Sequence, residues 1–228
     1  GALVQAGAVP VFLPTARNAF GMIGPVDWEA WDEASLREQI RSNPRIEDKS
    51  LADAPRPFRM ACIQLCTYDG TVYNVRKVLE KIGHLCDYVL WDEAWIGYNA
   101  FHPLFNDHSP MRLQDLQPEM AGLFSTQSVH KQGAGFSQAS QIHKRDEHIR
   151  GQKRHVDHKR FNEAYLQHAS TSPFYPLFAS LDVNAKIHEG KGGEMLWDRC
   201  IELGIETRKK LREFGQHFAR SGRTPQEQ

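Results

Sequence analysis

The sequence lacks an excess of charge of either sign, a long apolar run and paired cysteines. Lys and Arg number 28 and so do Asp and Glu, so no whole-chain field would hold the protein on nucleic acid or an anionic membrane. No apolar run approaches the roughly 20 residues that span a bilayer. The four cysteines show no spacing of a zinc site or a disulfide framework. We therefore expect reduced thiols, a cytoplasmic location, and no metal, nucleic-acid or membrane partner.

What is present is the composition of a globular protein. The chain has 228 residues, 40% of them hydrophobic and 25% charged, which is enough for one core of ordinary size. It begins without Met and without a basic segment, so its start does not read as a signal peptide. Residues 1–13 resemble the end of a helix that passes into a strand. We therefore expect a fragment whose N-terminal part is missing.

Apolar runs with strand character alternate with helical patterns along the chain. The expected buried strands are 9–13, 58–66, 87–95 and 122–128. Segments 35–43 and 74–86 carry apolar residues at helical spacing, and two further helices are expected over 172–190 and 193–219. This order predicts an α/β fold with a mainly parallel sheet and helices on both faces.

Three segments that follow expected strands carry polar side chains, at 67–74, 91–98 and 125–131. Open parallel sheets bind ligands beyond the carboxyl ends of their strands, so these loops should converge on one pocket. Lys131, Asp92 and Ser128 supply an amine, a carboxylate and a hydroxyl there. Pyridoxal phosphate requires this set: a lysine for a Schiff base with the aldehyde, a carboxylate for the pyridine nitrogen, and hydroxyls for the phosphate.

Three motifs carry a resemblance to a known family. They are "DEAW" at 92–95, "TQSVHKQGAGFSQASQIHK" at 126–144 and "HASTSPFYPLFASLDVNA" at 168–185. Together they resemble the bacterial ornithine/lysine/arginine decarboxylases, pyridoxal-phosphate enzymes of aspartate-aminotransferase fold type I. The resemblance implies that 1–190 form part of the cofactor-binding large domain, and that 191–228 form a helix leading towards a small domain that is absent.

The resemblance also implies a role for each matching residue. Lys131 would be the Schiff-base lysine, and Asp92 the partner of the pyridinium nitrogen. Ala94 would pack beneath the ring, and Trp95 would line the pocket. Ser128 and His130 would contact the phosphate. The hydroxyl that reaches the phosphate of the neighbouring subunit would be that of Ser170, with Thr171 next to it. Each active site would then lie at a subunit interface, in a homodimer or a larger homo-oligomer.

Several of these residues have a structural alternative. Asp92 is also suited to a helix N-cap or a loop carboxylate, and Trp95 to core packing. Ser170 is placed to cap the helix that opens near Pro173. His130 has the alternative of a hydrogen-bonded structural histidine.

The family chemistry is the loss of CO2 from a basic amino acid, giving an amine of the polyamine pathway. The insert at 141–165, with "HIRGQ", resembles the ornithine branch, so ornithine is favoured over lysine or arginine. The basic segment 143–160 raises the alternative of nucleic-acid binding, although it lacks interleaved aromatic residues. A further alternative is an inactive fragment or a regulatory binding protein, and we expect these 228 residues alone to have little or no activity.

Overall fold

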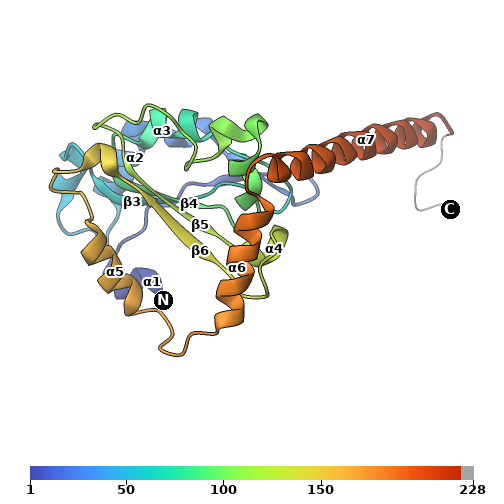
Figure 1. Ribbon diagram of the computed structural model, residues 1–228. Helices are drawn as coiled ribbons and strands as arrows, with labels where there is room; N and C mark the ends of the chain where they lie inside the picture. Colours follow the sequence, from blue (N-terminus) through green and yellow to red (C-terminus); the bar gives the residue numbers. More distant parts are fainter. Residues whose placement is uncertain (222–228) are drawn as a thin grey trace.

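The computed structural model describes the backbone of residues 1–221 and the side chains of residues 1–216 (Figure 1). Its centre is a four-stranded sheet with the order β3-β4-β5-β6. The strands are β3 (Phe58–Gln64), β4 (Cys86–Asp92), β5 (Gly122–Gln127) and β6 (Gln141–Arg145). The first three run parallel, and β6 pairs antiparallel with β5. The expected α/β fold with a mainly parallel sheet is confirmed.

One face of the sheet carries the main core. Helix α3 (Val75–Ile82) begins at Asn74, whose side chain accepts the N–H of Lys77 at 3.0 Å, and it buries an apolar stripe against the sheet. Helix α2 (Glu33–Ser42) begins at Asp32, which accepts the N–H of Ser35. These helices pack with the alternate, inward-facing residues of β3, β4 and β5: Ile63, Val89, Trp91 and Leu123.

The opposite face is covered more thinly. Tyr88 and Phe124 stack there with ring centroids 5.0 Å apart, and Phe161 of α5 (His158–Leu166) stacks on Phe124 at 5.6 Å. Gly122 lets this stack approach the strand, because a Cβ at that position would lie 2.2 Å from Tyr88 Cε1. Met60 of β3 stays exposed on the same face. Helices therefore lie on both faces, but only one face is sealed.

The expected strand over 9–13 is wrong. That stretch has no regular structure, and the chain instead forms a small antiparallel hairpin of β1 (Thr15–Arg17) and β2 (Ile23–Val26). The hairpin is tied to the domain by side chains, since Asp69 accepts the N–H of Ile23 at 2.8 Å and Tyr73 accepts the N–H of Val26 at 2.6 Å. An apolar run forms a strand only where a neighbouring strand satisfies its backbone, and none lies beside this one.

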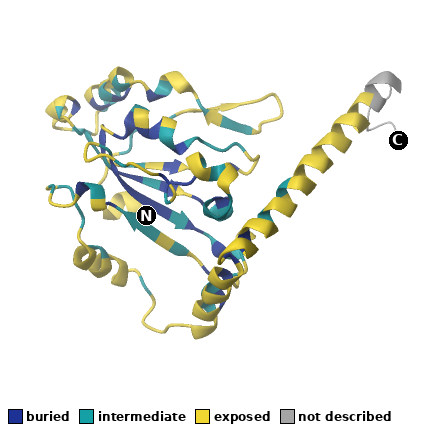
Figure 2. Ribbon diagram, turned by 45° about the horizontal axis from the view of Figure 1, so that its top comes forward, coloured by how far each residue is buried: buried dark blue, intermediate teal, exposed yellow. Residues whose placement is uncertain are grey.

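The C-terminal helices follow the expectation. Helix α6 (Tyr175–Ile187) and helix α7 (Lys191–Ser221) are separated by Gly190, which has a φ of +64°. Helix α7 extends away from the sheet, and Figure 2 shows it exposed along most of its length. Residues 222–228 of the expected segment 191–228 lie outside the described residues.

The remaining elements are short. They are α1 (Ala2–Gln5), η1 (Trp28–Trp31), η2 (Lys49–Asp53), η3 (Gly97–Phe101), η4 (Pro103–His108), α4 (Val129–Gln132) and η5 (Glu147–Ile149). In the described part of the chain no helix is long and apolar enough to cross a membrane. Within the same residues, no three His, Cys, Asp or Glu side chains are grouped so that they would hold a metal ion.

Candidate functional site

Three loops meet where β3, β4 and β5 end. Tyr68 follows β3, and its ring centroid lies 4.8 Å from that of Trp95, which follows β4. Lys131 lies in α4, directly after β5, and its Nζ is 4.2 Å from the centroid of the Trp95 ring. The predicted meeting of the three loops is therefore confirmed by two direct contacts. Trp95 is the residue that joins them.

Lys131 presents its amine at this edge. Buried Val129 anchors the single turn of α4, while the Lys131 side chain is exposed and lies over the Trp95 ring as a cation–π pair. Among the described side chains, no carboxylate lies within ion-pair distance of its Nζ. The amine is thus held near the strand ends by an aromatic ring and not by a salt bridge.

Asp92 is the last residue of β4 and is exposed. Its Oδ1 accepts the backbone N–H of Ala94 at 3.0 Å, which fixes the turn that leaves the strand. One carboxylate oxygen is used in this way, and Oδ2 makes no hydrogen bond to the described residues. Asp92 therefore acts as a loop carboxylate through Oδ1, as the alternative interpretation had it, and still has Oδ2 free at the site.

Ser128 and His130 flank the start of α4 differently. Ser128 is the N-cap residue, yet its hydroxyl makes no capping hydrogen bond, and the residue lines a pocket beside α4. His130 is partly buried, and its Nδ1 donates to the carbonyl of Ala139 at 3.0 Å, so this nitrogen carries the proton. At Nδ1, His130 therefore is the hydrogen-bonded structural histidine of the alternative interpretation. Its Nε2 is left as the nitrogen that is available to a ligand.

Ser170 and Thr171 are not brought to this group within one chain. Both are exposed on the loop between α5 and α6, which lies at the bottom of Figure 1, away from α4. The hydroxyl of Ser170 accepts the N–H of Ser172 at 3.1 Å, so it stabilises a local turn ahead of Pro173. It does not cap α6, whose N-cap is Phe174.

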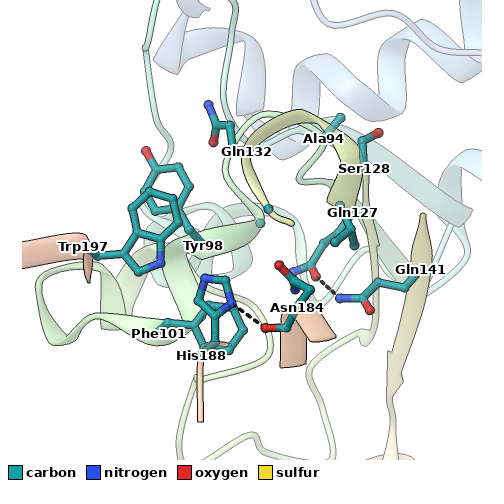
Figure 3. Close-up of a pocket in the computed structure, with 13 residues that line it drawn as sticks. Ala94, Tyr98, Phe101, Gln127, Ser128, Gln132, Gln141, Asn184, His188 and Trp197 are labelled. Carbon is teal, nitrogen blue, oxygen red and sulfur yellow. Dashed lines mark hydrogen bonds between the residues drawn. The ribbon is translucent and has the colours of Figure 1, made fainter. Parts of the chain in front are cut away.

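A pocket beside α4 is lined by the predicted residues Ala94 and Ser128 and by aromatic residues that the sequence did not single out (Figure 3). Its aromatic walls stack in pairs, with Tyr98 on Trp197 and Phe101 on His188, each at 4.2 Å between ring centroids. Nδ1 of His188 donates to the carbonyl of Asn184 at 2.8 Å. The signal that was missed is a pair of polar residues four apart on one helix, which share a face.

Helix α6 fixes the turn that follows Lys131. Asn184 Oδ1 accepts the N–H of Ala134 at 2.9 Å, and the hydroxyl of Ser180 accepts the N–H of Phe136 at 3.1 Å. Gly133 makes this approach possible, because a Cβ there would lie 2.6 Å from Asn184 Oδ1. The only residues that α6 buries are polar for this reason: they serve as acceptors for a loop backbone.

Glu93 is the second residue that the sequence did not single out. It is fully buried, directly after Asp92, and accepts hydrogen bonds from Ser125, Asn99 and Gln127. Burial raises the pKa of the Glu93 carboxyl, although the hydrogen bonds from these three side chains lower it. Among the described residues, this buried carboxyl has no cationic partner, and it directly follows the exposed carboxylate of Asp92.

Comparison with known proteins gives one consistent result. The family model for "Orn/Lys/Arg decarboxylase, major domain" matches residues 1–223. The chain is 59% identical to the constitutive ornithine decarboxylase of Escherichia coli and 57% identical to the ornithine decarboxylase of Haemophilus influenzae, over 92% of its length in both cases. It spans 29% and 28% of those two relatives.

A solved structure matches the fold as well. The chain superimposes on lysine decarboxylase A from Pseudomonas aeruginosa with a TM-score of 0.82 and 33% identity. The match covers 94% of this chain and 27% of that one.

Proposed function

The chain belongs to the Orn/Lys/Arg decarboxylase family, and from that premise we propose that it forms the cofactor-binding part of an enzyme that decarboxylates ornithine. The preference for ornithine is supported by 59% and 57% identity to proteins named ornithine decarboxylase, against 33% to a lysine decarboxylase. Lysine and arginine are the alternative substrates. The division into a large-domain part (1–190) and a connecting helix (191–228) belongs to the same proposal.

One observation carries the proposal. The amine of Lys131 lies over Trp95 at the edge where three parallel strands end, with Asp92 and Ser128 on adjacent strand ends. This set of groups fits pyridoxal 5'-phosphate: an amine for its aldehyde, a carboxylate for its pyridine nitrogen and a hydroxyl for its phosphate. The amine has no carboxylate partner among the described residues, so it has no ion pair to break before it reacts.

When bound, pyridoxal 5'-phosphate supplies an electron sink for the pair released as the Cα–carboxylate bond of the substrate breaks. Lys131 would hold the aldehyde carbon through its Nζ. Asp92 would hold a proton on the pyridine nitrogen through Oδ2, since Oδ1 is taken by the N–H of Ala94. The small side chain of Ala94 leaves room for a planar ring, and Trp95 walls the site beside Lys131.

The phosphate contacts would come from two places. Ser128 would donate its free hydroxyl, and His130 would donate from Nε2 in its doubly protonated form, because its Nδ1–H is bound to Ala139. We propose that Ser170 and Thr171 serve the site of a second subunit. Their exposed position on the loop between α5 and α6, away from Lys131 of the same chain, supports that role and with it a homo-oligomer.

The nucleic-acid alternative is weakened by the way the basic segment is used. Lys144 donates to buried Asp146 at 2.7 Å and to the carbonyl of Val156 at 2.9 Å. Arg154 donates to the backbone carbonyls of three residues, Asp87, Pro118 and Met120. Cations that satisfy their own protein's carbonyls are not free to neutralise phosphates. Lys144 and Arg154 therefore act as structural braces along the sheet, whereas Arg150, Lys153, Lys159 and Arg160 stay exposed.

The decisive experiment is covalent trapping of the cofactor. Pyridoxal 5'-phosphate is added to the purified chain, the mixture is reduced with borohydride, and the modified lysine is mapped by mass spectrometry. We expect label at Lys131, lost in Lys131→Ala and retained in Lys153→Ala, an exposed lysine outside the site. Label spread over surface lysines, with none at Lys131, would overturn the proposal and favour a non-catalytic binding protein.

The substrate is tested on the chain extended to the length of its relatives. Release of CO2 from ornithine, lysine and arginine is compared at equal concentration, with Lys131→Ala as the blank. We expect the highest kcat/KM for ornithine. A preference for lysine or arginine would keep the reaction and correct the substrate.

A further inference from the structure

Glu93 connects four parts of the protein. Its backbone N–H donates to the carbonyl of Thr126 at 2.9 Å, which adds one more link between β4 and β5 beyond the last strand residue. Its carboxyl accepts from Ser125 and from Gln127, both on β5. It also accepts a hydrogen bond from Nδ2 of Asn99, in η3, at 2.7 Å. The same nitrogen donates to the carbonyl of His108 at 2.8 Å.

The network continues beneath the start of α4. Gln127, which bonds to Glu93, directly precedes Ser128, and its Oε1 accepts from Gln141 at 2.7 Å and lies 3.2 Å from Nε2 of His143. Two strands beyond β4 are thereby tied to one carboxyl. Ser128, the N-cap residue of α4, directly follows Gln127 in the sequence, and Trp95 lies two residues after Glu93. Both are therefore held close to the hydrogen-bond network.

Because side chains alternate between the two faces of a strand, the burial of Glu93 determines where Asp92 points. Successive side chains of an extended chain point to opposite faces, so burial of Glu93 on the sealed face directs Asp92 to the open one. The register agrees, because Asp92 is paired with Gln64 on one side and Thr126 on the other, and neither of these is on the sealed face. A shift of this strand end by one residue would exchange the two carboxyls.

We propose that Glu93 is a positioning residue of the candidate site: through Ser125, Gln127 and Asn99 it holds the end of β4 so that Asp92 and Ser128 keep their relative places. This inference rests on the proposed function for its purpose, but its geometry is independent of any cofactor. Removing a side chain that orients a site through another residue is costly, with losses of roughly 10- to 100-fold known for metal sites in general.

Two variants separate the contacts. In Glu93→Ala all three side-chain hydrogen bonds are lost. In Glu93→Gln the amide oxygen retains the donors of β5, whereas its NH2 faces the NH2 of Asn99, so only the link to η3 is broken. Glu80→Gln, an exposed glutamate on α3, is the matched control for loss of a carboxyl.

The first measurement is hydrogen exchange of the purified chain without cofactor, under conditions where each variant is folded. We expect Glu93→Ala to speed exchange roughly tenfold or more at 93–99 and 126–131, and Glu93→Gln to speed it at 96–108 alone. Glu80→Gln should change neither. Equal acceleration over the whole sheet in Glu93→Ala, or none, would overturn the positioning role.

The second measurement is the affinity of each folded variant for pyridoxal 5'-phosphate. We expect it to fall about tenfold in Glu93→Ala and to be largely restored in Glu93→Gln, because the latter keeps the link between β4 and β5. Unchanged affinity in Glu93→Ala would refute the role in the site even with exchange altered. If the unmodified chain fails to bind the cofactor, that result counts against the proposed function. The role of Glu93 in the hydrogen-bond network is then tested by hydrogen exchange alone.

Discussion

The Nζ of Lys131 lies 4.2 Å from the centroid of the Trp95 ring, so the candidate reactive amine rests on the aromatic residue that also contacts the loop after β3. A cation–π pair at an exposed position is worth about 0.5 to 1 kcal/mol. We expect a double-mutant cycle of Lys131→Ala and Trp95→Leu, measured by urea unfolding, to give a coupling energy in this range. Strict additivity of the two changes would show that the ring does not hold the amine.

Gly122 is required by the ring of Tyr88. We expect Gly122→Ala to destabilise the fold by about 1 to 3 kcal/mol or more, since the new Cβ would lie 2.2 Å from Tyr88 Cε1 and the stack with Phe124 would have to move. Gly204→Ala is the control, because nothing lies within 4 Å of a Cβ there and the position is inside helix α7. That variant should gain about 0.5 to 1 kcal/mol. Urea unfolding of both checks the pair.

The parts of the fold that were predicted from the sequence are those where neighbours along the chain decide the outcome. The runs at 87–95 and 122–128 are apolar enough to be buried from either side, and the run at 58–66 is apolar enough for an edge strand, so each formed a strand. The run at 9–13 is also apolar, but in the described part of the chain no strand pairs with it, so the predicted strand does not form. Strand β6 was missed because "QIHKR" is polar, and it is held by pairing to β5.

The candidate site also has parts that the local sequence predicts and parts that depend on segments far apart in the chain. Lys131 and Asp92 were singled out because they follow expected strands and match motifs of the decarboxylase family, and their roles stay predictions. Glu93 was overlooked beside Asp92, since no local signal tells which of two adjacent carboxyls is buried. The pocket of Asn184 and His188 depends on contacts between segments about 50 residues apart, such as Ala134 with Asn184, which no local pattern encodes.

Cysteine reactivity should follow burial. Cys86 is 2% exposed, and burial raises its pKa to about 12, so roughly one thiol in ten thousand is ionised at pH 8. Cys200 is exposed on α7. We expect iodoacetamide to modify Cys200 within the fast phase and Cys86 only after unfolding, as followed by mass spectrometry. Cys62 is exposed as well, so Cys200→Ser should remove the label at Cys200 and leave that at Cys62, and early label at Cys86 would contradict the core packing.

The raised pKa of Glu93 predicts how stability changes with pH. A carboxyl whose pKa is higher in the folded state favours folding below its ordinary value of 4.5, and this contribution is lost as pH rises through the folded pKa. Glu93→Gln removes the dependence. The free energy of unfolding of wild type minus that of the variant should therefore fall as pH rises above about 4.5, from a plateau at lower pH. Urea unfolding across this range measures it.

Other titratable groups near Glu93 must be held constant in that comparison. They are Asp92, the preceding residue, His108, whose carbonyl accepts from Asn99, and His143, which lies beside Gln127. Burial lowers the pKa of His143, and its Nε2 lies 3.2 Å from Oε1 of Gln127 in the same network. A difference that stays flat from pH 4 to 8 would mean that Glu93 titrates equally in the folded and unfolded chains.

Ser170 gives a test of the shared site. Its side chain is exposed and bonds only within its own turn, so Ser170→Ala should change the stability of the chain by less than about 0.5 kcal/mol. If the hydroxyl serves a neighbouring subunit, the variant of the length-extended protein should nevertheless lose activity. Mixing it with inactive Lys131→Ala should then restore part of the activity, because a hybrid dimer contains one site with both residues intact. Restoration that fails while both variants exchange subunits would place Ser170 and Lys131 in the same chain's site, or Ser170 outside the site altogether.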